Sequence, residues 1–203
     1  MVKKREIDNS LIMVAVVIVL VLIFMFNNGG NKMQEEKENE ETIVVIETSK
    51  GNIEIELNQE KAPISVKNFL NYVKNNHYDG TVFHRVISNF MIQGGGFTPD
   101  GEQKPVDNPI KLESNNGLKN DEGTIAMART MVPDSATSQF FINVNNNDFL
   151  NYDTETEGYA VFGKITSGME IVNEIKAVTT GTRFGMPDWP TKDVVITKVY
   201  LKE

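Results

Sequence analysis

Apolar and polar residues alternate in short runs along most of this chain, and this two-residue period is typical of β-strands. Residues 42–48 read TIVVIET, and after the turn signal Ser49-Lys50-Gly51 residues 52–57 place their apolar side chains on one face. Similar patterns recur at residues 81–87, 90–93, 123–129, 138–144, 159–165 and 194–201, with a shorter candidate at residues 110–113. The pattern predicts about eight short strands.

Two segments carry the helical period instead. Pro63 suits the start of a helix, Ser65 is a candidate N-cap, and apolar residues then recur at helical spacing from Val66 to Val73. A shorter helix is predicted over residues 168–175. Two helices are too few, and too far apart, for repeated β-α-β units. The sequence therefore predicts a mostly β fold, an antiparallel closed barrel capped by two α-helices.

The front of the chain has a different pattern. Residues 11–26 are uninterruptedly apolar and would span roughly 24 Å as a helix, somewhat less than a bilayer core of about 30 Å. Lys3, Lys4 and Arg5 precede this run, so the positive-inside rule keeps the N-terminus in the cytoplasm. The pattern favours a membrane anchor that leaves the rest of the chain on the extracytoplasmic side.

Four parts of the chain are predicted from these patterns. They are a basic cytoplasmic N-terminus at residues 1–10, a single transmembrane signal-anchor at 11–27, an acidic flexible linker at 28–41 and the folded domain at 42–203. The alternative for the apolar run is a cleaved signal peptide, which would release a secreted form.

The composition narrows the function classes. The chain has 203 residues, a formal net charge of −8 and no cysteine. The negative charge argues against a nucleic-acid partner, and the lack of cysteine excludes disulfides, cysteine-based zinc sites and a thiol nucleophile. P-loop, Rossmann, HExxH and GxSxG motifs are also absent from the sequence, which argues against the enzyme classes that depend on them.

One stretch, residues 82–98 (VFHRVISNFMIQGGGFT), concentrates the candidate chemistry. Its alternation predicts a strand, a tight turn at Ser88-Asn89 and a returning strand that ends in three glycines, where the chain can turn sharply. Such a hairpin would carry a guanidinium, two apolar side chains and an amide onto one surface: Arg85, Phe90, Met91 and Gln93. The alternative is a core strand pair whose arginine simply reaches solvent.

Four further side chains invite interpretation. His84 lies on the opposite face of the strand from Arg85, and because no serine or carboxylate pattern accompanies it, we expect a structural histidine. Phe149 and Leu150 form an apolar pair in a polar loop, either as a cap on the core or as one wall of a binding groove. Trp189 falls in a proline-rich loop and is expected only to pack there.

Five ordered blocks of the sequence resemble the cyclophilin family of peptidyl-prolyl cis-trans isomerases, in variants similar to those of its bacterial-type members. The blocks are FHRVISNFMIQGGGFT at 83–98, GTIAMART at 123–130, SQFFIN at 138–143, DFLNY at 148–152 and GYAVFGKI at 158–165. The likeness covers the chain from about Ile43 to Leu201. It implies an eight-stranded antiparallel barrel capped by two helices, with the substrate groove on the outside of the barrel.

The resemblance also implies a set of site residues. The catalytic group would be Arg85, Phe90, Gln93 and Phe141. Arg85 would be the catalytic arginine, and Gln93 would orient the substrate and support Arg85. The substrate would further be bound by Met91, Ala128, Arg129, Thr130, Phe149, Leu150 and Tyr159. Of all these residues, the proline pocket would be lined by Phe90, Met91, Phe141 and Leu150.

These residue types suit the rotation of an X-Pro bond, whose barrier is roughly 18–20 kcal/mol. A fixed guanidinium can donate to the prolyl nitrogen once the bond twists and its lone pair is freed, so no metal or organic cofactor is needed. The sequence therefore predicts an isomerase (rotamase) for proline-containing polypeptides outside the cytoplasm, with a monomeric soluble domain. The alternatives are a non-catalytic peptide-binding or chaperone module on the same fold, and an adhesion or structural surface protein.

Overall fold

The computed structural model describes residues 42–202. The predicted N-terminus, signal-anchor and linker lie outside the described residues, so they stay predictions. Within residues 42–202, none of the helices has the length and apolar character needed to cross a membrane.

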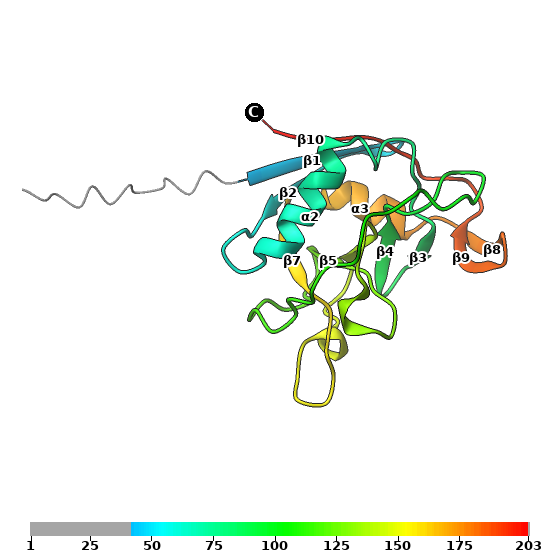
Figure 1. The fold of residues 1–203 in the computed structure, drawn as a ribbon. Coiled ribbons are helices and arrows are strands. Elements are labelled where there is room, and N and C mark those ends of the chain that lie inside the picture. Colours follow the sequence, from blue (N-terminus) through cyan, green and yellow to red (C-terminus); the bar gives the residue numbers. More distant parts are fainter. Residues whose placement is uncertain (1–41, 203) are drawn as a thin grey trace, which may run out of the picture. The chain divides into compact units, whose positions relative to one another are not determined.

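The described part of the chain consists of short strands and two α-helices (Figure 1). The elements are β1 Thr42–Thr48, β2 Gly51–Leu57, α2 Pro63–Lys74, β3 Arg85–Ile87, β4 Met91–Gly94, β5 Thr124–Met127, β6 Phe140–Asn143, β7 Val161–Ser167, α3 Met169–Lys176, β8 Thr180–Arg183, β9 Met186–Pro190 and β10 Ile196–Leu201. Two single 3-10 turns, η1 Pro133–Ser135 and η2 Asp148–Leu150, interrupt the loops. The candidate strand at residues 110–113 is reduced to one isolated bridge between Ile110 and Ala136.

Eight of these strands form one antiparallel sheet in the order β10-β1-β2-β7-β5-β6-β4-β3. The eight strands and the two helices confirm the prediction, but the barrel does not close as a continuous ladder. The edge strands β3 and β10 do not pair with each other; residues 80–83, which precede β3, contact residues 194–196 through an isolated bridge between Val82 and Val195 and through backbone hydrogen bonds on either side of it. The sheet is therefore a curled half-barrel, because residues 80–83 meet the opposite edge through this short contact instead of lengthening β3.

The prediction of a loop around Trp189 was wrong, because residues 180–190 form a second, two-stranded sheet from β8 and β9. The hairpin turns through Phe184 and Gly185, whose φ angles of 53° and 79° match the two-residue turn that suits the twist of paired strands. Its sequence signal is weak, because Phe-Gly is not a common turn pair and Pro187 and Pro190 argue against a strand. Figure 1 shows β9 beside β3, at the edge of the main sheet.

The main core lies on the face of the sheet that α2 and α3 cover. Phe69 of α2 is fully buried at its centre, with its ring 5.1 Å from Tyr78, 5.7 Å from Phe140 and 5.2 Å from Phe162. Helix α2 begins at Pro63, so the predicted cap at Ser65 is wrong. The free N–H groups in the first turn of the helix find a partner that is distant in the sequence. Those of residues 64 and 65 donate to the Glu113 carboxylate at 3.0 and 2.7 Å.

The opposite face of the same strands carries a second, smaller apolar cluster. Its buried members are Met91, Ala126, Phe141, Leu150 and Val161. Because successive strand residues point to opposite faces, Ile92 and Phe140 join the main core while their neighbours Met91 and Phe141 join the outer cluster. The predicted separation of Phe140 and Phe141 is confirmed, and the outer cluster is where the predicted site residues gather.

Candidate active site

Strand register places the central site residues in one row across the outer face. Arg85 of β3 pairs with Gln93 of β4, Gln93 pairs with Phe141 of β6, and Phe141 pairs with Ala126 of β5. Directly paired residues on antiparallel strands have Cβ atoms only about 4.5–5.5 Å apart. A guanidinium, an amide and an aromatic ring, distant in sequence, therefore stand side by side on a rigid sheet.

A small cavity of about 110 Å³ opens beside this row. It is lined by Arg85, Met91, Gln93, Ala128, Arg129, Phe141, Leu150 and Tyr159. Typical pockets for drug-sized ligands are about 300–1,000 Å³, so this cavity suits one small ring rather than a whole cofactor. Among residues 42–202, no three histidine or carboxylate side chains are grouped to hold a metal ion.

The apolar walls of the cavity are firmly held. Met91 and Phe141 are buried, and the Phe141 ring meets the Tyr159 ring edge-on at 5.6 Å. The guanidinium of Arg129 lies 4.5 Å from the Tyr159 ring centre, while its Nε donates to the Gly158 carbonyl at 2.9 Å. Arg129 thus fixes the Tyr159 wall, and Arg85 is the second guanidinium that lines the cavity.

Arg85 lines the cavity, and about two-fifths of its side chain is exposed. Its Cζ atom lies 5.9 Å from the centre of the Phe90 ring, and its Nε lies 3.8 Å from the Asp188 carboxylate. An arginine stays charged at any physiological pH and presents several N–H donors in one plane. The position of Arg85 in the lining of a ring-sized cavity allows one of these donors to face a ligand bound there.

The amide of Gln93 is oriented by a residue that the sequence analysis missed. Gln93 Nε2 donates to Oε1 of Gln139 at 2.8 Å, so its contact with Arg85 is that of a strand partner. Gly96 makes room for this, because a Cβ atom there would lie 2.6 Å from Cγ of Gln139. The alternation that places Phe141 outward also places residue 139 outward, and this signal was available in the SQFFIN block.

His84 lies on the other side of the strand from Arg85 and is almost fully buried. Its ring packs against Phe97 at 4.7 Å and Trp189 at 5.9 Å, and its Nδ1 has no hydrogen-bond partner within the described part of the chain. Burial, assisted by the positive charge of Arg85, lowers the pKa of His84 to about 4. The histidine is therefore neutral near pH 7, which agrees with a structural role.

A buried asparagine network supports the site from below, and the sequence analysis did not identify it. Asn147 Nδ2 donates to Oδ1 of Asn143 at 2.7 Å, and Asn143 Nδ2 donates to Oδ1 of Asn120 at 3.2 Å. The outer members of this network, Asn147 and Asn120, donate from their amides to backbone carbonyls of three predicted site residues: Phe90, Leu150 and Tyr159. The network therefore fixes the backbone from which three site side chains project.

Three predicted residues flank the cavity without lining it. Phe149 is 70% exposed and packs against Phe90 with the two rings tilted and their centres 5.4 Å apart. Thr130 accepts and donates hydrogen bonds within its own loop, where its N–H donates to the Ser135 hydroxyl at 3.0 Å. The structure thus brings eight of the eleven predicted site residues around one cavity and leaves Phe90, Thr130 and Phe149 beside it. The roles of all eleven stay predictions.

Comparison with known proteins identifies the same family across the whole described domain. The profile of the cyclophilin type peptidyl-prolyl cis-trans isomerase/CLD family matches residues 43–201. The chain is 57% identical to peptidyl-prolyl cis-trans isomerase cyp18 of Streptomyces antibioticus, over 75% of this chain and 94% of that protein. It is 53% identical to peptidyl-prolyl cis-trans isomerase B of Escherichia coli K12, over 79% of this chain and 99% of that protein.

A solved structure agrees with these relatives. A cyclophilin type peptidyl-prolyl cis-trans isomerase of Cryptosporidium parvum superposes with a TM-score of 0.68 and 27% identity, over 80% of this chain and 98% of that chain. That protein has also been crystallised in the presence of the dipeptide Ala-Pro. The chain belongs to the cyclophilin-type peptidyl-prolyl cis-trans isomerases, and it is close to the bacterial ones.

Proposed function

We propose that this isomerase acts on folding or exposed polypeptides outside the cytoplasm, with Arg85 as the donor that stabilises the twisted X-Pro bond. The observation that carries the role of Arg85 is its place on the wall of a ring-sized cavity whose other walls include Met91, Phe141 and Leu150. The Cryptosporidium parvum protein crystallised with Ala-Pro supports an X-Pro segment as the group that enters the cavity.

The mechanism needs only a difference in binding between the planar and the twisted peptide bond. In either planar state the prolyl nitrogen shares its electron pair with the carbonyl and is a poor acceptor. As the bond twists, the nitrogen regains that pair, and the Arg85 guanidinium donates a hydrogen bond to it. The interaction is stronger in the transition state than in the cis or trans ground state, which is the condition for acceleration.

The apolar walls have a separate task in this mechanism. Phe141, Met91 and Leu150 hold the prolyl ring while the N-terminal side of the peptide rotates around the fixed ring. Their burial also keeps water from the hydrogen bond, which strengthens an interaction between a charge and a lone pair. Gln93, held by Gln139, presents its amide next to Arg85 and is placed to bind the backbone of the peptide.

The role of Arg85 is tested by comparing the wild-type chain with Arg85→Ala and Arg85→Lys in a proline-peptide isomerisation assay. Loss of a single preorganised donor costs about 10²–10³ in rate, and we expect a loss of this order for Arg85→Ala with the fold unchanged. Lysine keeps the charge but not the planar donor set, so Arg85→Lys should recover only part of the rate.

A matched control removes a positive charge elsewhere. Lys164 of β7 forms an ion pair with Glu56 of β2, with 3.0 Å between the ammonium nitrogen and the carboxylate oxygen. The Lys164→Ala variant should keep the wild-type rate. A wild-type rate in Arg85→Ala would reject the donor role of Arg85. A wild-type chain that binds proline peptides without accelerating their isomerisation would instead favour the peptide-binding module.

The location outside the cytoplasm rests on the sequence of the N-terminal part. Lys3, Lys4 and Arg5 before the apolar run at residues 11–26 support an exported domain. The test is a reporter that is active only outside the cytoplasm, fused after residue 203 of the full-length chain. The reciprocal experiment fuses, at the same site, a reporter that is active only in the cytoplasm. Activity of this second reporter would contradict the proposed location.

A further inference from the structure

The β8–β9 hairpin brings an acidic side chain to the proposed catalytic arginine. Asp188 of β9 places its Oδ2 3.8 Å from Nε of Arg85, and each side chain is 39% exposed. The two residues are about a hundred positions apart in the sequence and meet because β9 lies beside β3. Exposed ion pairs of this kind contribute little to the stability of a fold, so the pair calls for another explanation.

The backbone of Asp188 has an uncommon conformation. Its φ angle is 60°, in the left-handed region that residues other than glycine rarely adopt. Aspartate and asparagine tolerate this region better than other side chains, and such conformations concentrate at functional sites. In β9 this conformation falls between Pro187 and the buried Trp189, at the residue whose carboxylate reaches Arg85.

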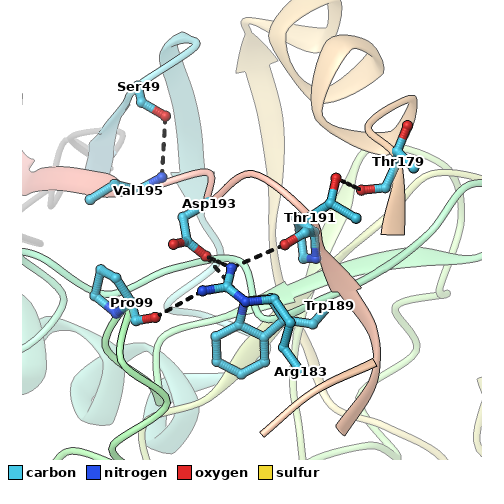
Figure 2. Close-up of polar contacts among 9 residues, drawn as sticks. Ser49, Pro99, Thr179, Arg183, Trp189, Thr191, Asp193 and Val195 are labelled. Carbon is cyan, nitrogen blue, oxygen red and sulfur yellow. Dashed lines mark hydrogen bonds and ion pairs between the residues drawn. The ribbon is translucent and has the colours of Figure 1, made fainter. Parts of the chain in front are cut away.

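The hairpin is anchored to the rest of the domain by polar contacts of Arg183, which Figure 2 shows. Arg183 of β8 donates to the Asp193 carboxylate at 2.6 Å and to the Pro99 carbonyl at 3.3 Å. Trp189 is fully buried, and its Nε1 donates to the same Asp193 carboxylate at 3.1 Å. The residue next to Asp188 is therefore held in place, so the carboxylate is presented by a fixed strand rather than by a loose surface loop.

The side of the guanidinium that is engaged matters for catalysis. Asp188 approaches Nε of Arg85, so the ion pair does not occupy the two terminal amino groups, Nη1 and Nη2. Those groups carry four of the five guanidinium N–H donors. The 3.8 Å separation is that of an ion pair rather than a hydrogen bond, so Asp188 attracts the Nε side of the guanidinium and leaves the terminal donors free for a ligand in the cavity that Arg85 lines.

We propose that Asp188 is a positioning residue for the isomerisation, which acts by fixing the guanidinium of Arg85 from the β8–β9 hairpin. The proposal rests on the proposed role of Arg85 as the donor to the prolyl nitrogen. Asp188 itself touches neither the substrate nor the reacting nitrogen. Its contribution is to reduce the number of orientations that the Arg85 side chain samples. Loss of Asp188 should therefore lower kcat and have little effect on peptide binding.

The test is Asp188→Asn, measured as kcat and KM for a proline peptide in the full-length chain. Asparagine has the same size and also tolerates positive φ, so the change removes the charge while keeping the backbone. We expect kcat to fall about three- to fivefold, with KM within about twofold of wild type. The chain has a single tryptophan, Trp189, so unchanged fluorescence emission will show that the hairpin is intact.

A double-mutant cycle separates positioning from a general effect of the hairpin. In an Arg85→Ala background, Asp188→Asn should cause almost no further loss, because the side chain through which it acts is gone. Glu56→Gln removes a carboxylate that pairs with Lys164 on β7, and it should leave kcat unchanged.

Several outcomes would overturn the proposal: a wild-type or faster kcat in Asp188→Asn, or the same fold-loss with and without Arg85. If Arg85→Ala alone retained the wild-type rate, the donor role of Arg85 would fail, and this result is distinct from a failure of Asp188.

Discussion

The two faces of the curled sheet use the same residue types for different purposes. Phe140 and Phe141 are consecutive in β6, and both are buried. Phe140 lies among rings of the main core, 5.7 Å from Phe69 and 5.5 Å from Tyr78, whereas Phe141 meets Tyr159 and covers one side of the cavity. Burial alone therefore does not distinguish a core residue from a site residue, and the surroundings of each ring decide its role.

The strongest way to break this comparison is to truncate each phenylalanine in turn. Phe140→Ala should lower the free energy of unfolding by about 3–5 kcal/mol, because it leaves a cavity among rings that cannot close on it. Phe141→Ala opens an existing cavity at the surface, so it should cost less stability but lower kcat/KM about 30-fold through loss of the apolar wall. Urea unfolding and a proline-peptide assay measure the two effects.

The matched variants Phe140→Leu and Phe141→Leu keep more of the volume and should show the same division at smaller size. If both alanine variants lost stability equally and kcat/KM equally, the two faces would not have separate roles, and the assignment of Phe141 to the site would be wrong.

The division into two faces was predictable from the sequence, because a two-residue period determines which side chains share a face. The prediction of the strand at residues 138–144 thus separated Phe140 from Phe141 correctly. Alternation does not determine register, so the row from Arg85 through Gln93 to Phe141 depended on the resemblance to a known family. Gln139 shares the outer face and was overlooked, although the same period places it there.

The remaining parts of the site depend on contacts that no local pattern indicates. Asp188 was missed because β8 and β9 turn through Phe-Gly, lie next to prolines and read as a loop. Closure of the barrel was predicted wrongly because a strand pattern does not show where pairing between strands ends. The pattern covers residues 81–87, but β3 begins only at Arg85. The loop with Leu150 is held by Asn120, whose partners lie about thirty residues away.

His84 tests the comparison of the two faces in another way. It is a titratable group that packs against aromatic rings on the opposite side of the strand from Arg85. Its pKa of about 4 in the fold lies below the usual value of 6.5, so the unfolded chain binds more protons between these values. Stability from the neutral ring is therefore complete above pH 6.5 and is lost as the pH falls toward 4. Between pH 7 and pH 5, this group should lower the free energy of unfolding by about 2 kcal/mol.

The measurement compares wild type with His84→Phe, which keeps an aromatic ring against Phe97 and Trp189 but cannot take up a proton. Carboxylates also titrate in this range, so the informative quantity is the difference between the two chains at each pH. Wild type should lose about 2 kcal/mol more than His84→Phe between pH 7 and pH 5. Parallel stability curves would show that His84 does not titrate with a lowered pKa.

The smallest expected effect concerns the asparagine network under the outer face, where two neighbouring residues provide a matched pair. Asn147 is buried, and its amide donates to the Phe90 carbonyl at 2.8 Å and to Oδ1 of Asn143 at 2.7 Å. Asn145 is exposed, and its amide donates to the Asn89 carbonyl at 3.3 Å and accepts from the N–H of the next residue at 3.0 Å, both at the surface. If the network fixes the backbone of the site, truncation of the two asparagines should have different consequences.

Asn147→Ala should lower the free energy of unfolding by about 1–2 kcal/mol, because it leaves the buried Oδ1 of Asn143 without its donor. The Phe90 carbonyl keeps the N–H of Val144 at 3.1 Å, so Phe90 should shift rather than detach, and KM should rise about two- to threefold. Asn145→Ala should change stability by less than about 0.5 kcal/mol and leave KM unchanged. A stability loss in Asn147→Ala with wild-type KM would limit the network to folding, because a role in fixing the site requires that the peptide be bound less well.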